Sequence, residues 1–285
     1  MRAKRPIVAL CYDFDGTLAP GNMQEYGFFS GLGDIAKTFW REATALAQEN
    51  AADPILCYMM LMIQKARLGK IKTTHEALRA YGRDVRFFPG VEDWFARIRA
   101  FGHQEGVEVE HYIVSSGLRE LIEGSAIGKA FKKIYACSFL YDNNDCAMWP
   151  ANVVNYTTKT QYLFRINKGV EDDADNLAVN AFVPEAERRI PFSRIIYLGD
   201  GLTDVPCMRL VRLQGGIAIA VYPKGRAQTA KRLLTEDRVN YAMEANYAAG
   251  GKLERLVQAA IGRIALTHRM TTLAGQNHRH HLPNQ

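Results

Sequence analysis

The chain has 285 residues, of which 48% are hydrophobic and 23% charged, a composition typical of a globular protein with a substantial core. Its net charge of +6 is unevenly distributed: four arginines and no acidic residue follow Glu254, so the part up to Glu254 carries only +2. This distribution lacks the basic face of a nucleic-acid-binding module, and we expect no nucleic-acid partner.

The five cysteines are scattered and include no C-x-x-C pair, which argues against a disulfide framework and a zinc ribbon. A basic start precedes an apolar run, but Asp13 and Asp15 interrupt this run and no small-residue cleavage site follows, unlike a signal peptide. The longest apolar block, residues 55–63, is too short to cross a bilayer. We therefore expect a cytoplasmic protein without a membrane partner.

The first predicted element is a strand over residues 7–12, whose unbroken apolar run is typical of a strand covered on both faces. The sequence DFDGTL, residues 13–18, follows at once, and Gly16 allows a sharp turn of the backbone. In an open α/β sheet the ligand crevice lies beyond the carboxyl ends of the strands. We therefore expect Asp13 and Asp15 to face it, one as a nucleophile and the other as a proton carrier.

Residues 20–88 are predicted to form an inserted, all-helical domain. Apolar residues recur at helical spacing over 33–51, and Asp53-Pro54 opens a second helix that extends to about residue 68. Thr73 and Glu76 form a capping box for a third helix, which ends at Gly82. No strand pattern interrupts these three helices.

The rest of the chain alternates between predicted strands and helices, and this alternation predicts a parallel sheet covered on both faces. The strands are expected at 109–115, 134–139, 194–198 and 216–221, and the helices at 91–101, 118–127, 159–167, 225–234 and 253–266. Residues 141–150, rich in Asp and Asn, predict a hairpin or loop. Residues 1–19 and 89–270 thus form the α/β core, and 271–285 are expected to be a disordered tail.

Three later segments carry polar residues at the ends of predicted elements. Ser115, Ser116 and Gly117 follow an apolar strand, and Lys159 opens a helix within Thr-Lys-Thr, residues 158–160. The segment GDGLTD, residues 199–204, follows another apolar strand and supplies Asp200 and Asp204.

These four motifs, in this order, resemble those of the haloacid dehalogenase-like superfamily, whose members are mostly magnesium-dependent phosphohydrolases. The resemblance extends over residues 6–247 and implies a Rossmann-like core with a helical cap. It also implies that Asp13 attacks phosphorus to form an aspartyl-phosphate, and that Asp15 serves as general acid and base. Lys159 would hold the carboxylate of Asp13 and the phosphoryl group together, with Lys168 as the weaker candidate for that role.

The resemblance further implies a Mg²⁺ ion held by the side chains of Asp13 and Asp200 and the backbone carbonyl of Asp15. Asp204 would complete the coordination directly or through water. The phosphoryl oxygens would be bound by the hydroxyl of Ser115, from which its neighbour Ser116 is hard to separate, and by the backbone at Gly117.

The helical insertion and the Ser-x-Gly motif resemble the phosphoserine phosphatase branch. That branch has a glutamate nine residues after the nucleophile, where this chain has Asn22, so phosphoserine itself is not expected as the substrate. Dehalogenation is also disfavoured, because Asp15 supplies a second carboxylate that dehalogenases lack. Close to the nucleophile loop, Glu25 could bind the leaving group of the substrate, or this segment could be an ordinary linker.

The expected function is therefore a magnesium-dependent phosphatase acting on a small phosphorylated metabolite. A phosphotransferase of the same superfamily and a catalytically silent member that binds a phosphorylated ligand or a protein remain alternatives.

Overall fold

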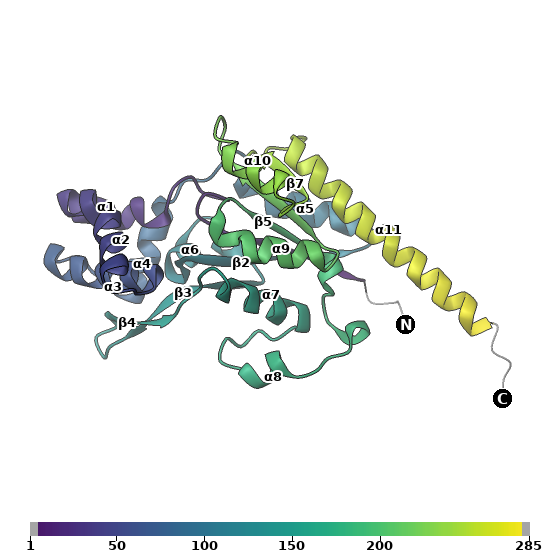
Figure 1. The fold of residues 1–285 in the computed structure, drawn as a ribbon, viewed down its shortest axis with the longest axis horizontal. Coiled ribbons are helices and arrows are strands. Elements are labelled where there is room, and N and C mark those ends of the chain that lie inside the picture. Colours follow the sequence, from purple (N-terminus) through teal and green to yellow (C-terminus); the bar gives the residue numbers. More distant parts are fainter. Residues whose placement is uncertain (1–4, 281–285) are drawn as a thin grey trace.

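The computed structural model describes residues 5–280, with side chains up to residue 274. Its core is a seven-stranded sheet of order β4-β3-β2-β1-β5-β6-β7 (Figure 1). Neighbouring strands pair in parallel, except that β3 and β4 are antiparallel. The strands are β1 (Ile7–Tyr12), β2 (Glu108–Leu118), β3 (Lys133–Tyr141), β4 (Ala147–Asn152), β5 (Ile195–Gly199), β6 (Ile217–Tyr222) and β7 (Tyr241–Glu244).

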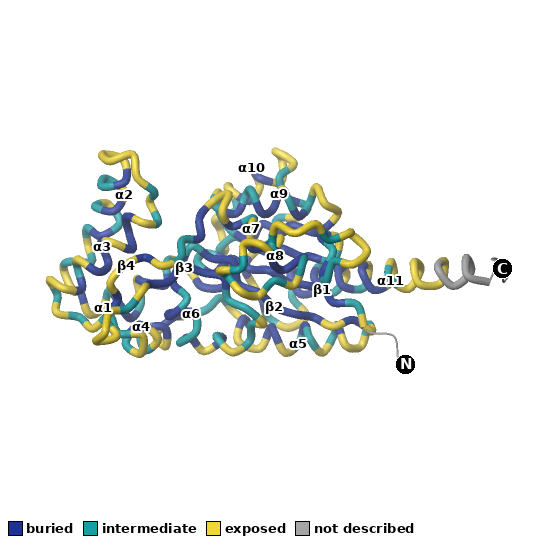
Figure 2. Tube along the Cα trace, turned by 90° about the horizontal axis from the view of Figure 1, so that it is seen from below, coloured by how far each residue is buried: buried dark blue, intermediate teal, exposed yellow. Residues whose placement is uncertain are grey.

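Helices lie on both faces of this sheet: α7 and α9 cover one face, and α5 and α11 the other (Figures 1 and 2). The α-helices are α1 (Gly27–Leu32), α2 (Phe39–Glu49), α3 (Pro54–Gly69), α4 (His75–Tyr81), α5 (Val91–Gln104), α6 (Arg119–Gly124), α7 (Thr158–Lys168), α8 (Asn176–Asn180), α9 (Val205–Leu213), α10 (Gln228–Thr235) and α11 (Lys252–His280). The predicted α/β class with a Rossmann-like sheet is confirmed.

The two central strands are the most completely buried part of the fold. Every residue of β1 and β5 is buried, in keeping with the apolar runs that predicted them, and the middle of the sheet is dark blue in Figure 2. Their parallel register places Tyr12 beside Leu198. The residues that follow β1 and β5 therefore emerge together at one edge of the sheet.

Between β1 and α5 the chain forms a helical insertion, residues 23–84, which lies beside one end of the sheet (Figure 1). The helices predicted over 53–68 and 73–82 correspond to α3 and α4, and Asp53 caps α3 by accepting hydrogen bonds from the backbone N–H groups of Ile55 and Leu56. The helix predicted from residue 33 differs: α2 begins only at Phe39, after a 3-10 segment over 33–38.

Helix α1 was not predicted, because glycines at 27, 31 and 33 lower the helix propensity of this segment. Its helical form is stabilised by packing, since Phe28 and Leu32 are buried in the core cluster. Tertiary burial thus outweighs local preference here.

Two further predictions concern the segments after β3 and in α11. Residues 141–150 were predicted to be a hairpin or loop; the observed structure is the antiparallel hairpin β3–β4. The expectation of a disordered tail from residue 271 is wrong for 271–280, where α11 continues, and residues 281–285 lie outside the described part. Leu266, Met270 and Leu273 recur at helical spacing across the start of this extension and are exposed, so the apolar pattern continues past residue 271 but faces away from the core.

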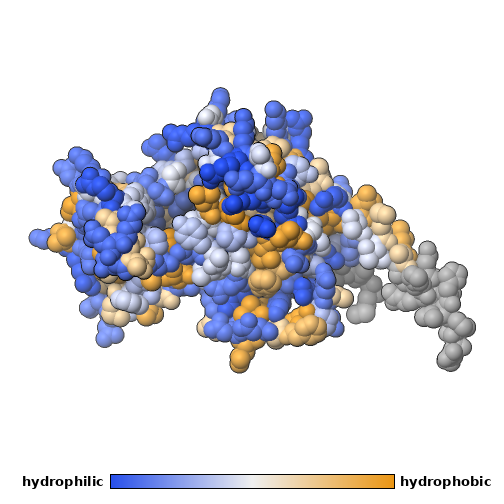
Figure 3. All heavy atoms as spheres, in the orientation of Figure 1, coloured by the Kyte–Doolittle hydropathy of each residue, from blue (hydrophilic) through white to orange (hydrophobic). Residues whose placement is uncertain are grey.

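The surface mixes hydrophilic and apolar side chains, and apolar ones are visible along the exposed part of α11 (Figure 3). Among residues 5–280, none of the helices is both apolar enough and long enough to pass through a bilayer.

Candidate active site

The candidate site forms where β1 and β5 end, and the sheet itself brings its first two carboxylates together. Asp13 follows β1, and its backbone N–H donates to the carbonyl of Leu198 in β5 at 2.9 Å. Asp200 follows β5 directly. The predicted proximity of the first and fourth motifs is therefore a consequence of parallel pairing between neighbouring strands.

The turn after β1 packs directly against Asp200. Gly16 has a φ of +74°, in the left-handed region, and a Cβ added to it would lie 2.3 Å from Oδ2 of Asp200. Only glycine satisfies both conditions, because any other residue would strain the backbone and displace the carboxylate. The glycine of the first motif thus sets the position of a carboxylate from the fourth.

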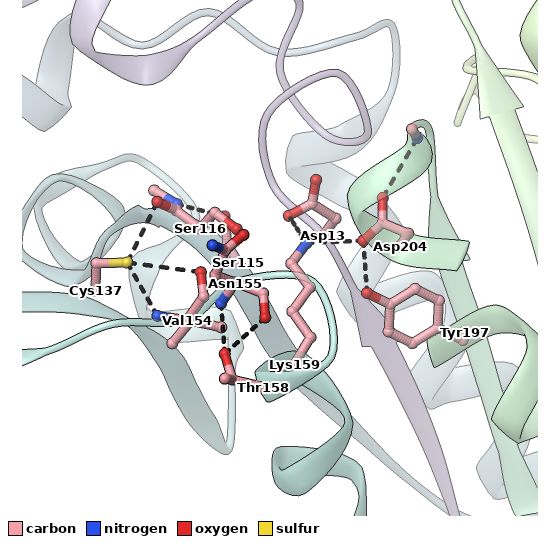
Figure 4. Close-up of polar contacts among 12 residues, drawn as sticks. Asp13, Ser115, Ser116, Cys137, Val154, Asn155, Thr158, Lys159, Tyr197 and Asp204 are labelled. Atoms are coloured by element: carbon pink, nitrogen blue, oxygen red, sulfur yellow. Dashed lines mark hydrogen bonds and ion pairs between the residues drawn. The ribbon is translucent and has the colours of Figure 1, made fainter. Parts of the chain in front are cut away.

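Lys159 connects these motifs from the first turn of α7 (Figure 4). Its side chain is fully buried, and its Nζ donates to Oδ1 of Asp13 at 3.0 Å and to Oδ1 of Asp204 at 2.8 Å. Lys168, the other candidate, donates instead to the backbone carbonyls of Val179 and Ala181 at 2.7 Å. The geometry therefore favours Lys159 as the lysine of the site.

Asp204 is held by donors besides Lys159. The hydroxyl of Tyr197 donates to its Oδ1 at 2.7 Å, and the N–H of Gly201 donates to Oδ2 at 3.3 Å (Figure 4). Tyr197 was not singled out in the sequence, where it reads as one more residue of a buried strand. Tyr197 carries the only polar side-chain group of β5, and this isolated hydroxyl in an apolar strand could have marked it as a candidate site residue.

Asp15 points toward the helical insertion and the second motif. Its Oδ1 accepts a hydrogen bond from the backbone N–H of Met23 at 2.8 Å. A Cβ added to Gly117 would lie 3.1 Å from its Oδ2 and 2.0 Å from the methyl carbon of Met23. The side chain of Asp15 is therefore fixed between the insertion and the end of β2.

The two serines of the second motif lie at the end of β2, beside Asp15, and have different surroundings. Ser115 is buried, and its Oγ accepts from the backbone N–H of Gly117 at 3.1 Å, which leaves its own proton available. The Oγ of Ser116 is buried without a hydrogen-bond partner among the described residues. Its carbonyl accepts from the hydroxyl of Tyr58 at 2.7 Å, which ties α3 to this strand.

Glu25 lies in the insertion, in a short 3-10 segment close to Asp15, and its side chain is exposed. Its Oε1 accepts from Nδ2 of Asn22 at 2.6 Å and from Nε1 of Trp40 at 2.8 Å. Glu25 therefore also connects this segment to α2. Its neighbour Gln24 is buried, and its Oε1 has no hydrogen-bond partner among residues 5–280.

The electrostatics of the site are those of crowded carboxylates. Burial and the nearby charge of Asp204 raise the pKa of Asp13 to about 6, although Lys159 opposes the shift. Burial, Asp204 and Asp13 raise the pKa of Asp200 to about 8. Burial and the charge of Asp13 raise the pKa of Asp15 well above its usual value. Burial alone would lower the pKa of Lys159, but Asp13 and Asp204 outweigh it and keep the ammonium charged.

One cation therefore faces four carboxylates, and the arrangement is suited to a further positive charge. Oxygens of Asp13, Asp200 and Asp204 lie within 4.8 Å of one another. Within residues 5–280, no side chain donates a hydrogen bond to Asp200 or forms an ion pair with it, although Asp200 is half-buried. A set of hard carboxylate oxygens, one of which belongs to the half-buried and uncompensated Asp200, fits a divalent cation such as Mg²⁺. The side chain of Asp15 is outside this set.

A family model described as haloacid dehalogenase-like hydrolase matches residues 10–209 of the chain. An uncharacterized protein of Borreliella burgdorferi is 32% identical over 288 residues, which cover 92% of this chain and 99% of that protein.

Two solved structures illustrate the similarity of fold. A phosphoserine phosphatase in apo form has a TM-score of 0.53 and 13% identity, with 84% of this chain and 94% of that chain covered. A HAD family hydrolase from Salmonella enterica subsp. enterica serovar Typhi has a TM-score of 0.50 and 16% identity, with 82% of this chain covered. This chain spans 66% of the length of that hydrolase. The family predicted from the four motifs is confirmed: the chain belongs to the haloacid dehalogenase-like hydrolases.

Proposed function

We propose that the protein is a magnesium-dependent phosphatase that hydrolyses a small phosphorylated metabolite through an aspartyl-phosphate on Asp13. The observation that carries this proposal is the contact of the buried Lys159 with both Asp13 and Asp204, next to the uncompensated Asp200. A site that only binds a phosphorylated ligand has no need for a second carboxylate beside Asp13, at Asp15. The solved phosphoserine phosphatase of similar fold supports a phosphatase activity.

Asp13 is the nucleophile in this proposal. Lys159 donates to its Oδ1, and the second carboxylate oxygen points away from the lysine in Figure 4. This oxygen forms the bond to phosphorus as the bond to the leaving alkoxide breaks. Lys159 keeps the carboxylate oriented and offsets the charge of the incoming phosphoryl group.

Asp15 moves the protons. Because burial and Asp13 raise its pKa, Asp15 can hold the proton that the leaving alkoxide needs. In the second half of the reaction it takes a proton from the water that attacks phosphorus, and the bond between phosphorus and Asp13 breaks. The N–H of Met23 fixes the orientation of Asp15 for both steps.

Mg²⁺ would be held by Asp13 and Asp200, with the carbonyl of Asp15 and with Asp204 directly or through water. When bound, it would neutralise charge on the phosphoryl oxygens. Tyr197 orients Asp204 for this role through its hydroxyl. Ser115 has a free hydroxyl proton to donate to a phosphoryl oxygen, with Gly117 beside it; the unpartnered Oγ of Ser116 is the alternative donor.

The test is release of phosphate from a generic aryl phosphate by purified protein. We expect turnover with Mg²⁺, none after EDTA, and recovery when Mg²⁺ is restored. Lys168→Met is the matched control for Lys159→Met, because both lysines are in α7 and only Lys159 contacts the carboxylates. Undiminished turnover in EDTA would refute the metal assignment, and equal activities of the two lysine variants would refute the role of Lys159.

Substrate choice is proposed to involve Glu25. Its Oε1 binds Asn22 and Trp40, so Glu25→Ala removes structural contacts as well as charge. Glu25→Gln keeps an accepting oxygen and removes only the charge, which separates the two effects. If Glu25 binds a cationic leaving group, Glu25→Gln should lower kcat/KM for the preferred metabolite and leave kcat/KM for an aryl phosphate unchanged. Equal effects on both substrates would reject this role.

A further inference from the structure

A polar cavity lies at the end of β5 opposite to the active site, and residues of α11 form one side of it. Figure 1 shows α11 extending beyond the core. The cavity has a volume of about 380 Å³. Its lining combines the residues before β5, the turn after α9 and one side of α11: Ser193, Arg194, Gly215, Arg263, Ile264, Thr267, His268 and Thr271. Arg194 precedes β5 and Asp200 follows it, so the five-residue strand separates this cavity from the active site by roughly 17 Å.

The charges of this cavity are uncompensated. Arg194, Arg263 and His268 line it, and none of its lining residues is acidic. Among the described residues, neither arginine side chain forms an ion pair or hydrogen bond, and the sequence contains no acidic residue after Glu254. Arg194 is half-buried, and a guanidinium group in such a position is normally paired with a carboxylate, because an unpaired charge is costly to remove from water. Arg263 is exposed and adds a second positive charge at the edge of the cavity.

The pKa shifts of Arg194 and His268 are consistent with a cavity that lacks a negative charge. Burial lowers the pKa of Arg194. Burial, followed by the charge of Arg194, lowers the pKa of His268. The shift at His268 thus includes repulsion from Arg194, and the lining of the cavity contains no carboxylate that would offset it.

The hydroxyls of the cavity divide into two kinds. Thr267 donates to the carbonyl of Arg263 at 2.9 Å, and Thr271 donates to that of Thr267 at 3.0 Å, so both hydroxyl protons are used within α11. The hydroxyl of Ser193 does not donate to a backbone carbonyl in this way, so its proton is available to a ligand. The donors available to a ligand are therefore two guanidinium forks and one serine hydroxyl.

We propose that this cavity binds a phosphate-type oxyanion. A dianionic phosphate group can neutralise both guanidinium groups at once, whereas a carboxylate neutralises one, and the forked geometry of arginine matches phosphate oxygens. The volume exceeds that of a phosphate group alone, so it also admits a small organic substituent. The bound anion connects α11 to the start of β5, outside the catalytic machinery.

The test follows the imidazole of His268 by NMR, with its signal assigned from a His268→Gln variant. Orthophosphate is titrated into EDTA-treated protein at constant ionic strength, with chloride as the comparison ion. Methylphosphonate, which carries a small organic substituent, is titrated as a second probe. Comparing its affinity with that of orthophosphate shows whether the cavity prefers a substituted phosphate group or free phosphate.

We expect a saturable shift of the His268 signal with orthophosphate and none with chloride. Arg194→Gln and Arg263→Gln should each weaken binding on the order of tenfold. Arg226→Gln, an exposed arginine outside the cavity, is the control of equal charge change and should bind as the wild type does. Asp13→Asn should also bind normally, which separates this cavity from the active site.

A stability measurement adds an independent outcome. Because Arg194 is half-buried and unpaired, Arg194→Gln should unfold at a higher temperature than the wild type without phosphate, and should gain less from added phosphate. A His268 signal that does not respond to orthophosphate, or that responds equally in Arg194→Gln and Arg226→Gln, would overturn the proposal.

Discussion

Gly16→Ala tests how the first motif positions the fourth. An added Cβ would lie 2.3 Å from Oδ2 of Asp200, whereas ordinary contact begins near 3.4 Å, so the carboxylate must retreat by about 1 Å. A displacement of this size at a catalytic group costs on the order of 10²-fold in rate. The left-handed φ of +74° adds about 1–2 kcal/mol of backbone strain to the folded state.

Gly225→Ala is the matched control for this substitution. Gly225 has a φ of +79°, so alanine there carries the same backbone strain, but no atom lies within 4 Å of the added Cβ. The two variants should therefore lose similar thermal stability. Only Gly16→Ala should lose activity and affinity for Mg²⁺.

The assay measures aryl phosphate turnover as a function of Mg²⁺ concentration, together with the unfolding temperature of each variant. We expect Gly16→Ala to lower kcat/KM on the order of 10²-fold relative to Gly225→Ala. If the activities of the two variants agree within a factor of about two, well inside that margin, the contact between the turn and Asp200 does not control catalysis, and the reasoning fails.

Three further predictions address other parts of the molecule. Asp15→Asn should reduce turnover by about 10²–10⁴-fold, and activity within tenfold of the wild type would exclude a general acid–base role. Tyr197→Phe should weaken Mg²⁺ affinity roughly 10–100-fold, whereas Tyr135→Phe, which removes a buried hydroxyl distant from the carboxylates, should not; equal affinities would contradict this. Burial alone would raise the pKa of Glu110, but hydrogen bonds led by that of Arg189 hold it below its usual value of 4.5. The stability from this pair is thus present above pH 4.5 and is lost as the pH falls further, so the difference in unfolding temperature between wild type and Arg189→Gln should shrink from pH 6 to pH 3.

The parts of the fold that followed from the sequence are those where local pattern and tertiary environment agree. The apolar runs of β1 and β5 predicted buried strands, and the motifs after them predicted which carboxylates meet. Burial raises the pKa of Asp15, and so does the charge of Asp13, a neighbour that is evident from the sequence.

The parts that did not follow depend on contacts between distant segments. Helix α1 forms despite its glycines because Phe28 and Leu32 find a core to pack against. The role proposed for the hydroxyl of Tyr197 depends on Asp204, which lies next to it in space although it is seven residues away in the sequence. The cavity of Arg194 and Arg263 could not be predicted, since the two arginines are 69 positions apart and meet only when α11 packs beside β5.

Accumulation of a phosphoryl group on Asp13 tests the central claim most directly. Asp15→Asn protein, mixed with Mg²⁺ and an aryl phosphate, is quenched in acid and analysed by peptide mass spectrometry. We expect a burst of the aryl alcohol equal to the enzyme concentration and a phosphoryl group on the peptide that contains Asp13, both absent in the double variant that also carries Asp13→Asn. Continued phosphate release without a burst, with the Asp13 peptide unmodified, would show direct attack by water and contradict the covalent mechanism.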